Sequence, residues 1–249
     1  MISELNAPVV LVTGGAKRVG AAIVKRLHQE GWRAAIHYRA SADAADALAA
    51  ALNALRADSA ITVQADLLQT AMLAALIEPV ISRWGRLDAL VNNASTFYPT
   101  AVAEFTDTDW TTLIGSNLKA PLFLSQAAAP YLKEAGGCIV NITDIHAERP
   151  MAGYLIYNVA KAGLRGLTHA LARDLAPEIR VNAVAPGPIE WPDDGQISPE
   201  ERERILDHVP LKREGGVAQI AEAVKYLVCD ANFVTGQTIN VDGGRSISL

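Results

Sequence analysis

Short apolar runs alternate with longer segments of helical periodicity along the chain. Seven of these runs are predicted strands, at residues 8–15, 33–38, 60–66, 87–95, 136–143, 179–187 and 237–244. Between them, five stretches carry apolar residues at helical spacing, at 21–30, 42–56, 70–84, 109–134 and 157–175. Alternating strands and helices predict parallel pairing through right-handed crossovers. The pattern therefore predicts an α/β fold with a doubly wound, mostly parallel sheet of about seven strands. Because the strands are nearly continuous apolar runs, helices are expected on both faces.

The organisation of the chain predicts one domain. No internal repeat or low-complexity linker interrupts it, and 249 residues suffice to bury a single large core. We expect one domain over residues 1–249. The exception to the alternation is an insertion at about 186–214, rich in Pro, Asp, Glu and Arg. Segments of that length are either lids over a site or solvated surface insertions, and both readings stay open.

Composition excludes several classes of function. The net charge is −5 and no long basic run occurs, so nucleic acid is not an expected partner. No apolar run approaches the roughly 20 residues of a membrane span, and membrane is likewise not an expected partner. The first ten residues lack the basic region and apolar core of a signal peptide. A cytoplasmic protein is expected.

Cysteine and histidine usage suggests no metal. Cys138 and Cys229 lie far apart without CxxC spacing and are predicted to be buried thiols. His37, His146 and His208 form no metal-ligand pattern and are expected at the surface or in loops. No metal site is predicted.

The first strand runs into "TGGAKRVG", Thr13 to Gly20, and then into a helix. Glycine at such a turn lets backbone N–H groups approach a pyrophosphate, and the helix N-terminus supplies partial positive charge. Three glycines could also form only a tight turn. Because the motif follows the first strand of an alternating α/β pattern, we favour a dinucleotide site in a Rossmann-like sheet.

The second strand ends in "HYRAS" and indicates which dinucleotide binds. An NAD site usually has an acidic residue here for the ribose 2′-hydroxyl, but none occurs before Asp43. Arg39 and Ser41 stand there instead, with Lys17 and Arg18 in the first loop. Cations and a hydroxyl suit a 2′-phosphate, so NADPH is the predicted cofactor.

Polar residues also follow the third and fourth strands. "QADL" contains Asp66 and Leu67, and "NNAS" contains Asn93, Ala94 and Ser95. Both motifs fall on the carboxyl edge of the sheet, where ligands bind in open α/β folds. We expect Asp66 to accept from an adenine amino group, and Asn93 and Ala94 to pass beside the ribose. Separately, each residue is also a good turn former.

Two tyrosines compete for a chemical role. Tyr157 and Lys161 are four residues apart and so share one helix face, whereas Tyr154 has Asn158 at that offset. A free phenol titrates near 10, too high for easy proton exchange at neutral pH. A neighbouring ammonium favours the phenolate, which makes Tyr157 the candidate.

The constellation of motifs is specific where each motif alone is weak. "TGGAKRVG", "NNAS", Asn117 in "SNLKAPL", "YNVAK" and "VNAVAPGPI" occur in this order over nearly the whole chain. Together they closely resemble the short-chain dehydrogenase/reductase family. The resemblance implies that Tyr157 transfers a proton, Lys161 holds the nicotinamide ribose and lowers the tyrosine pKa, and Asn117 supports a water relay.

The resemblance also extends the expected cofactor site, placing Pro186 and Gly187 beside the nicotinamide. With the residues argued above, the full expected set is Gly14, Lys17, Arg18, Val19, His37, Tyr38, Arg39, Ser41, Asp66, Leu67, Asn93, Ala94, Ser95, Thr143, Tyr157, Lys161, Pro186, Gly187 and Ile189. The family is typically tetrameric, so a homotetramer is the expected assembly.

One position departs from the family pattern. Thirteen residues before Tyr157 the family usually carries a serine that hydrogen-bonds the substrate carbonyl, but here Asp144 stands. A carboxylate is a poor partner for a carbonyl oxygen unless it is protonated. Asp144 suits a substrate that presents N–H donors or needs protons delivered to nitrogen. The alternative is that Asp144 only caps a turn.

Further departures point to one branch of the family. Arg18 stands where members usually have glycine, and Phe97 in "NNASTFYPT" could cover a flat ring. With Asp144, "HYRAS" and the segment Asp58–Asp66, these residues are similar to the pteridine reductases. The similarity implies that the substrate is a pterin, or also a folate, stacked on Phe97.

The same resemblance assigns the remaining roles of the substrate site. Arg18 and Ser95 help hold the substrate and the cofactor phosphates, and Asp144 with Tyr157 delivers protons. The implied reaction is hydride transfer from NADPH to a C=N bond of a dihydropterin.

Two alternatives remain open. The first is a 3-oxoacyl-thioester or small-ketone reductase on the same fold, against which Asp144 and Arg18 argue. The second is a non-catalytic NADP(H)-sensing module, which has no evident need for Asn117, Tyr157 and Lys161 together.

Overall fold

The protein is built on one seven-stranded sheet. The computed structural model describes residues 7–191 and 198–248. The strands are β1 (Val9–Val12), β2 (Arg33–Tyr38), β3 (Ala60–Gln64), β4 (Ala89–Asn92), β5 (Cys138–Ile142), β6 (Arg180–Pro186) and β7 (Thr238–Val241). They are ordered β3-β2-β1-β4-β5-β6-β7, and every neighbouring pair is parallel. The predicted strands and the doubly wound fold are thus confirmed.

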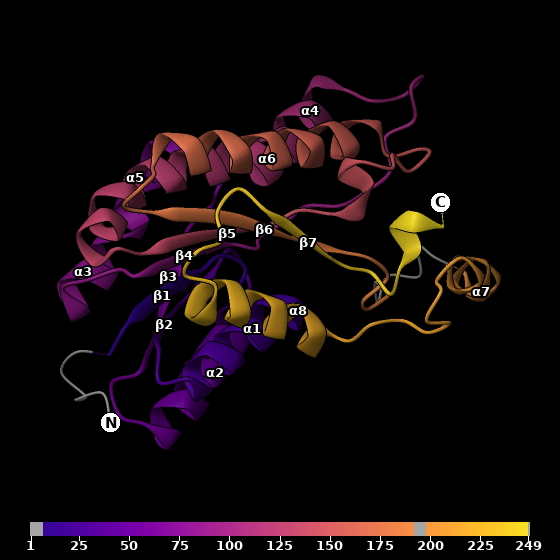
Figure 1. The fold of residues 1–249 in the computed structure, drawn as a ribbon. Coiled ribbons are helices and arrows are strands. Elements are labelled where there is room, and N and C mark those ends of the chain that lie inside the picture. Colours follow the sequence, from indigo (N-terminus) through magenta and orange to yellow (C-terminus); the bar gives the residue numbers. More distant parts are fainter. Residues whose placement is uncertain (1–6, 192–197, 249) are drawn as a thin grey trace.

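Helices cover both faces of the sheet, as Figure 1 shows. One face carries α1, α2 and α8, and the other carries α3, α5 and α6. The helices are α1 (Arg18–Gln29), α2 (Ala42–Leu55), α3 (Glu78–Trp84), α4 (Asp107–Ile114), α5 (Ala120–Ala135), α6 (Leu155–Asp174), α7 (Pro199–Asp207) and α8 (Val217–Lys225). Within the described residues, no helix is both long enough and apolar enough to cross a membrane.

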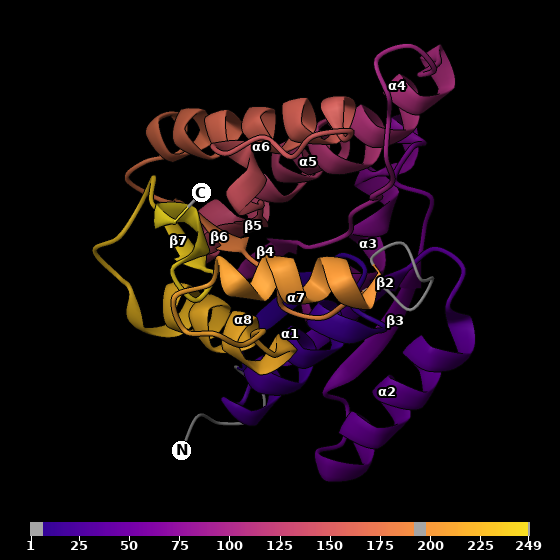
Figure 2. The same ribbon diagram turned by 90° about the vertical axis from the view of Figure 1, so that its right-hand side faces the viewer.

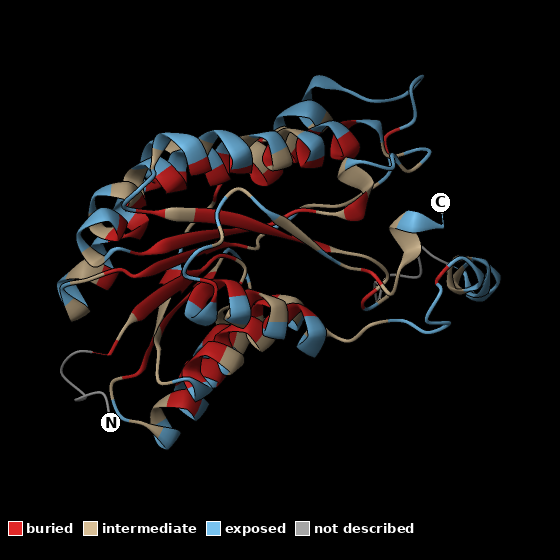
Figure 3. Cartoon of the chain, in the orientation of Figure 1, coloured by how far each residue is buried: buried red, intermediate tan, exposed pale blue. Residues whose placement is uncertain are grey.

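The central strands β1, β4 and β5 are buried on both sides (Figure 3), whereas the edge strands β3 and β7 are partly exposed. Successive side chains of a strand point to opposite faces. Val10 and Val12 accordingly pack in the cluster with α1, α2 and α8, whereas Val9 and Leu11 pack in the cluster with α3 and α5. Burial of apolar area on both faces is the main force that holds the layers together.

Two helices differ from the sequence prediction. The stretch 70–84 contains 3₁₀ turns at Thr70–Met72 and Ala74–Leu76, and a regular helix only from Glu78. Pro79 explains the late start, because proline fits the first turn of a helix but not its interior. The stretch 109–134 is divided by a π-helical turn, Gly115–Lys119, between α4 and α5.

A second difference concerns the cysteines. Cys138 is buried in β5 as predicted, but Cys229 is exposed and the prediction for it was wrong. Cys229 lies in the π-helical turn Tyr226–Asp230 that follows α8, where Leu227 and Val228 take the inward positions. The next residue therefore points away from the sheet.

The insertion lies at the carboxyl edge of the sheet. Figure 2 shows α7, which belongs to it, across this edge. Ser198 caps α7 by accepting a hydrogen bond from the Glu201 N–H. Residues 192–197 of the insertion lie outside the described residues.

A buried polar chain ties β4, β5 and α6 together. The Asn92 amide donates to Asn141 Oδ1 at 2.8 Å, and the Asn141 amide donates to Thr168 Oγ1 at 2.9 Å. Thr168 in turn donates to the Leu164 carbonyl. All three side chains are almost completely buried. Because buried polar groups are costly when unpaired, this chain of bonds sets the position of α6 on the sheet.

We expect Thr168→Val to destabilise the protein by about 1–3 kcal/mol, since the substitution keeps the shape but leaves the Asn141 amide without an acceptor. Urea unfolding measures the change as a lower midpoint at an unchanged slope. The exposed Thr111, substituted in the same way, is the control and should shift the free energy of unfolding by less than about 0.5 kcal/mol. Equal effects at the two positions would contradict a stabilising role for the buried chain.

Candidate active site

A cavity of about 610 Å³ opens at the carboxyl edge of the sheet. Residues from the ends of β1 to β6 line it, because parallel strands bring their carboxyl ends to one edge. Asn117 does not line the cavity, whereas the other predicted residues do: Gly14, Lys17, Arg18, Val19, His37, Tyr38, Arg39, Ser41, Asp66, Leu67, Asn93, Ala94, Ser95, Phe97, Thr143, Asp144, Tyr157, Lys161, Pro186, Gly187 and Ile189.

The glycine loop after β1 is held by the strand beside it. The Thr13 hydroxyl accepts from the N–H groups of Asn93 and Ala94, at 2.9 and 3.0 Å. The Asn93 amide donates to the carbonyls of Thr13 and Gly14. A Cβ at Gly20 would lie 2.1 Å from the Gly14 carbonyl oxygen, so only glycine fits there. The tight approach leaves the loop backbone and the start of α1 open to the cavity.

His37 corrects the expectation of a surface histidine. It lies in β2 and is only 2% exposed. The Gly14 N–H donates to its Nδ1 at 3.0 Å, so Nε2 carries the proton and donates to the Ala65 carbonyl. Burial lowers the pKa of His37, which keeps the ring neutral in this arrangement. The His37 side chain thus holds the glycine loop in place through its hydrogen bond with the Gly14 N–H.

Two cations stand at the β2 end of the cavity. Lys17 and Arg39 are exposed, and their side chains make no hydrogen bond or ion pair with the described part of the chain. Ser41 lies beside Arg39 on the cavity wall. Free cations, a hydroxyl and a glycine loop at a helix N-terminus fit the phosphates of a dinucleotide. Asp66, at the end of β3, accepts a hydrogen bond from the Leu68 N–H.

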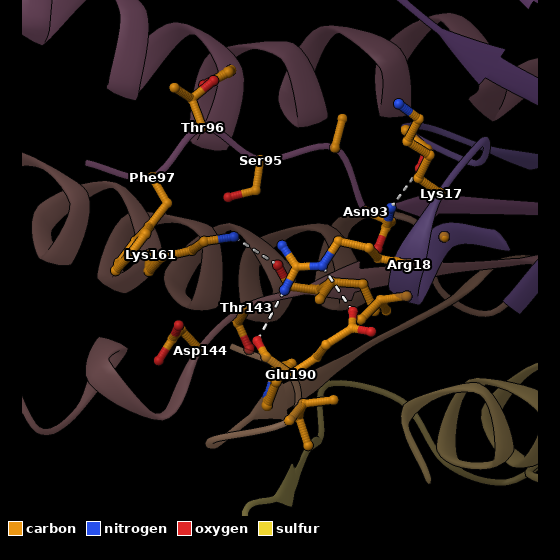
Figure 4. Close-up of a pocket in the computed structure, with 18 of the residues that line it drawn as sticks. Lys17, Arg18, Asn93, Ser95, Thr96, Phe97, Thr143, Asp144, Lys161 and Glu190 are labelled. Carbon is orange, nitrogen blue, oxygen red and sulfur yellow. Dashed lines mark hydrogen bonds and ion pairs between the residues drawn. The ribbon is translucent and has the colours of Figure 1, made fainter. Parts of the chain in front are cut away.

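Arg18 has a strained backbone and a partner that the sequence did not indicate. Its φ is +47°, a left-handed conformation that costs non-glycine residues about 1–2 kcal/mol. Its Nε donates to the Glu190 carboxylate at 2.8 Å, and a second guanidinium nitrogen donates to the Glu190 carbonyl at 2.9 Å. Figure 4 shows this pair at the cavity. The pair joins the first loop to the insertion.

Asp144 and Tyr157 are in direct contact. The Tyr157 hydroxyl donates to Asp144 Oδ2 at 2.7 Å. The other carboxylate oxygen, Oδ1, accepts from the His146 N–H and caps the 3₁₀ turn Ile145–Ala147. The structure thus shows the turn cap, but the second oxygen faces Tyr157, so Asp144 is more than a turn residue and its role toward a substrate stays a prediction.

Burial decides which form of Tyr157 is present. Removal from water raises the pKa of Tyr157 well above its usual value, and the Asp144 carboxylate raises it further. This differs from the expectation that the lysine would favour the phenolate. Lys161 Nζ lies 5.6 Å from the ring centroid and donates to the Ile142 carbonyl at 2.9 Å, but burial of the phenol and the neighbouring Asp144 carboxylate outweigh its effect on the pKa of Tyr157. Tyr157 is a neutral phenol and thus a proton donor.

Lys161 is only 2% exposed. Burial lowers its pKa to about 8, with the Asp144 carboxylate acting in the opposite direction. Among the described residues the ammonium has one acceptor, the Ile142 carbonyl, for its three N–H groups, so donors remain for a ligand in the cavity (Figure 4).

Phe97 packs between the two tyrosines. Its ring stacks on Tyr154, with centroids 4.6 Å apart and planes at 13°, and meets Tyr157 edge-on at 4.9 Å. Both Phe97 and Tyr157 line the cavity, whereas Tyr154 does not. The contacts place Tyr154 in a supporting position.

Asn117 lies behind the cavity wall in the π-helical turn. Its amide donates to the carbonyls of Leu113 and Thr96, and its Oδ1 accepts from Ser95 Oγ at 2.7 Å. Asn117 thereby reaches the cavity through Ser95.

Several wall residues were missed or left unplaced by sequence reasoning. Glu190, Ile205 and Arg245 come from the insertion and from the chain after β7. Trp191 and Met151, whose positions the sequence left open, also line the cavity. The "DGGR" sequence that follows the last strand was an available signal for Arg245, because it stands at the same sheet edge. The described residues contain no group of three or more metal-ligating side chains.

Comparison with known proteins gives a consistent family. A family model described as enoyl-(acyl carrier protein) reductase matches residues 14–246. Pteridine reductase 1 of Leishmania tarentolae is 38% identical over 100% of this chain and 99% of the relative. A 3-oxoacyl-(acyl-carrier-protein) reductase of Staphylococcus aureus is 36% identical over 94% of this chain and 96% of the relative. An uncharacterized oxidoreductase of Methylorubrum extorquens is 36% identical over 98% of this chain. Such close identities do not separate one substrate class from another.

The buried Lys161 predicts a specific pH dependence of stability. Its pKa is lower in the folded protein, about 8, than in the unfolded chain, so the unfolded state binds more protons above pH 8. The free energy of unfolding should therefore rise from pH 8 to 10, by up to about 2 kcal/mol relative to a Lys161→Met variant. Urea unfolding without added nucleotide measures it.

The exposed Lys25 provides the control for this experiment, since its ammonium stays in water in both states. Lys25→Met should follow the pH profile of the unsubstituted protein. Parallel profiles for Lys161→Met and the unsubstituted protein would show that burial does not perturb Lys161.

Proposed function

The chain belongs to the short-chain dehydrogenase/reductase family, and within that family of oxidoreductases we propose that it is an NADPH-dependent pteridine reductase. The proposed reaction reduces a dihydropterin, and also dihydrofolate, at a C=N bond. The observation that carries the proposal is the 2.7 Å hydrogen bond from Tyr157 to the Asp144 carboxylate.

The family uses a nicotinamide dinucleotide, and the cavity residues support NADPH as the form bound. Arg39, Ser41 and Lys17 offer two cations and a hydroxyl without an acidic residue, which suits a ribose 2′-phosphate. The glycine loop and the start of α1 would hold the pyrophosphate, and Lys161 the nicotinamide ribose. When bound, NADPH supplies the hydride.

The proton chemistry falls to Tyr157, Asp144 and Lys161. Tyr157 is held as a neutral phenol and can donate its proton to the substrate nitrogen beside the reduced carbon. The buried Lys161 ammonium stabilises the phenolate left behind. Asp144 lies at hydrogen-bond distance from the tyrosine oxygen and can relay to it a proton that the carboxylate takes up from water in the open cavity. A nitrogen heterocycle tolerates a carboxylate at this place, because its N–H groups are donors.

Phe97 supports a planar substrate. Tyr154 stacks on one face of its ring and Tyr157 meets the ring nearly at right angles, so the ring is held in one orientation at the cavity wall. A fixed aromatic ring stacks on a flat heterocycle with about 0.5–1.5 kcal/mol beyond area burial. A flexible acyl chain has no ring and therefore lacks this stacking contribution.

The 3-oxoacyl-thioester reductase is the second candidate, because a relative with that printed activity is almost equally similar. Asp144 weighs against it, since the carboxylate would repel a developing oxyanion. A sensing module without catalysis is disfavoured by the assembled Tyr157, Lys161 and Asp144.

Assembly and location are part of the same proposal. We infer one reductase domain over residues 1–249 with a substrate-loop insertion at about 186–214. The single sheet that unites all the described strands supports one domain. The family resemblance supports a homotetramer and a cytoplasmic location.

The decisive experiment compares two substrates in one assay of NADPH oxidation. We expect turnover with 7,8-dihydrobiopterin and at least about 100-fold lower kcat/KM with an acetoacetyl thioester, because the Asp144 carboxylate destabilises the alkoxide that develops on the 3-keto oxygen. Turnover on the thioester alone would contradict the proposal and leave the family assignment standing.

The role of the carboxylate is tested by Asp144→Asn. Asparagine keeps the oxygen that caps the turn at His146 but cannot exchange a proton with Tyr157. We expect kcat for the pterin to fall by about 100-fold or more, the usual contribution of general acid–base catalysis. NADPH affinity, measured by fluorescence, should change little. Retained turnover would reduce Asp144 to a turn residue.

A further inference from the structure

Arg245 is a cation on the cavity wall that has no acceptor among the residues described by the structure. It lies in the 3₁₀ turn Arg245–Ile247 that follows β7 and lines the same cavity as Asp144. The Asp242 carboxylate accepts from the N–H groups of Gly244 and Ser246, and these bonds fix the turn. The Arg245 side chain makes no hydrogen bond or ion pair with the described residues, and its Nε is buried.

The two carboxylates that act electrostatically on Arg245 already accept hydrogen bonds from other groups. Asp144 is bonded to Tyr157 and His146, and Asp242 to its own turn. Burial lowers the pKa of Arg245, and Asp144 and Asp242 partly oppose this without contacting it. Arginine nonetheless stays charged in proteins. A charged group withdrawn from water without a partner is costly, and an acceptor from a ligand would relieve that cost.

Topology places Arg245 at the substrate end of the cavity. Lys17 and Arg39 stand near β1 and β2, whereas β7 is at the opposite edge of the sheet beyond β6. Arg245 lines the cavity together with Asp144 and Tyr157, on the side away from the β1 and β2 loops that are expected to hold the cofactor phosphates. A group that meets Arg245 therefore belongs to the substrate, and to a short substituent of it.

We propose that Arg245 binds an oxyanion on a short substituent of the pterin, so that the enzyme prefers a phosphorylated or carboxylated pterin to a neutral one. This inference rests on the proposed function. A guanidinium recognises phosphate and carboxylate by paired, charge-assisted hydrogen bonds. Arg18 cannot substitute for it, because Glu190 occupies that guanidinium.

The test uses two substrates that differ only in the anion, 7,8-dihydroneopterin and its 3′-phosphate. We expect kcat/KM to be about tenfold or more higher for the phosphate, from the strength of a charge-assisted bond. In Arg245→Gln this ratio should fall toward one, chiefly through KM for the phosphate, and Arg245→Lys should retain part of it. Circular dichroism checks that the variants fold.

Arg39→Gln is the matched control. It removes a cation from the other end of the cavity and should raise KM for NADPH while the ratio between the two pterins stays as in the unsubstituted enzyme. A ratio that falls equally in both variants would show a general effect of charge and overturn the inference.

Other outcomes separate the inference from the proposed function. If both pterins are turned over with equal kcat/KM, only the role of Arg245 is overturned. If neither pterin is turned over, the proposed function and the role of Arg245 are both overturned. A loss of kcat on both pterins with a shifted pH profile would make Arg245 a positioning residue for Asp144 instead. An Arg245-dependent preference for dihydrofolate alone would overturn the assignment to a short substituent.

Discussion

The parallel alignment of the strands is the constraint on which the rest of the molecule depends. Because every strand runs in the same direction, the chain after each strand emerges at one edge. The glycine loop, Asp66, Ser95, Asp144, Gly187 and Arg245 each follow a different strand and meet at one cavity. Most of these residues are far apart in sequence, and no local interaction would bring them together. The apolar layers on both faces hold this edge in place.

Much of this edge could be predicted because it depends on patterns that are local. The apolar runs predict the strands. The spacing of four residues predicts that Tyr157 and Lys161 share a helix face. The π-helical turn at Asn117 and the burial of His37 could not be predicted. Each depends on packing between distant segments. The pairing of Arg18 with Glu190 likewise joins residues 172 positions apart.

The two departures from the family pattern, Arg18 and Asp144, each carry a local energetic cost. A residue with φ of +47° costs energy where glycine would cost none, yet Arg18 is there. Asp144 places a carboxylate against the buried Tyr157 phenol and raises the pKa of that phenol. A serine at position 144 would carry no charge and would not raise it. Such local costs persist where a site needs them. Both changes alter what can approach Tyr157, and neither improves the packing of the core.

Charge, more than overall similarity, distinguishes the possible substrates. Relatives with two different printed activities match this chain at 38% and 36% identity, because most positions serve a fold that both share. The cavity itself is divided, with Lys17 and Arg39 at the β2 end and, at the β7 end, the Asp144 carboxylate and the Arg245 guanidinium, which has no hydrogen-bond partner among the described residues. The 3-oxoacyl group of a thioester offers no N–H donor for Asp144. A nitrogen heterocycle with an acidic substituent would offer a donor to Asp144 and an anion to Arg245, so in the proposed function two different residues would recognise the ring and its substituent.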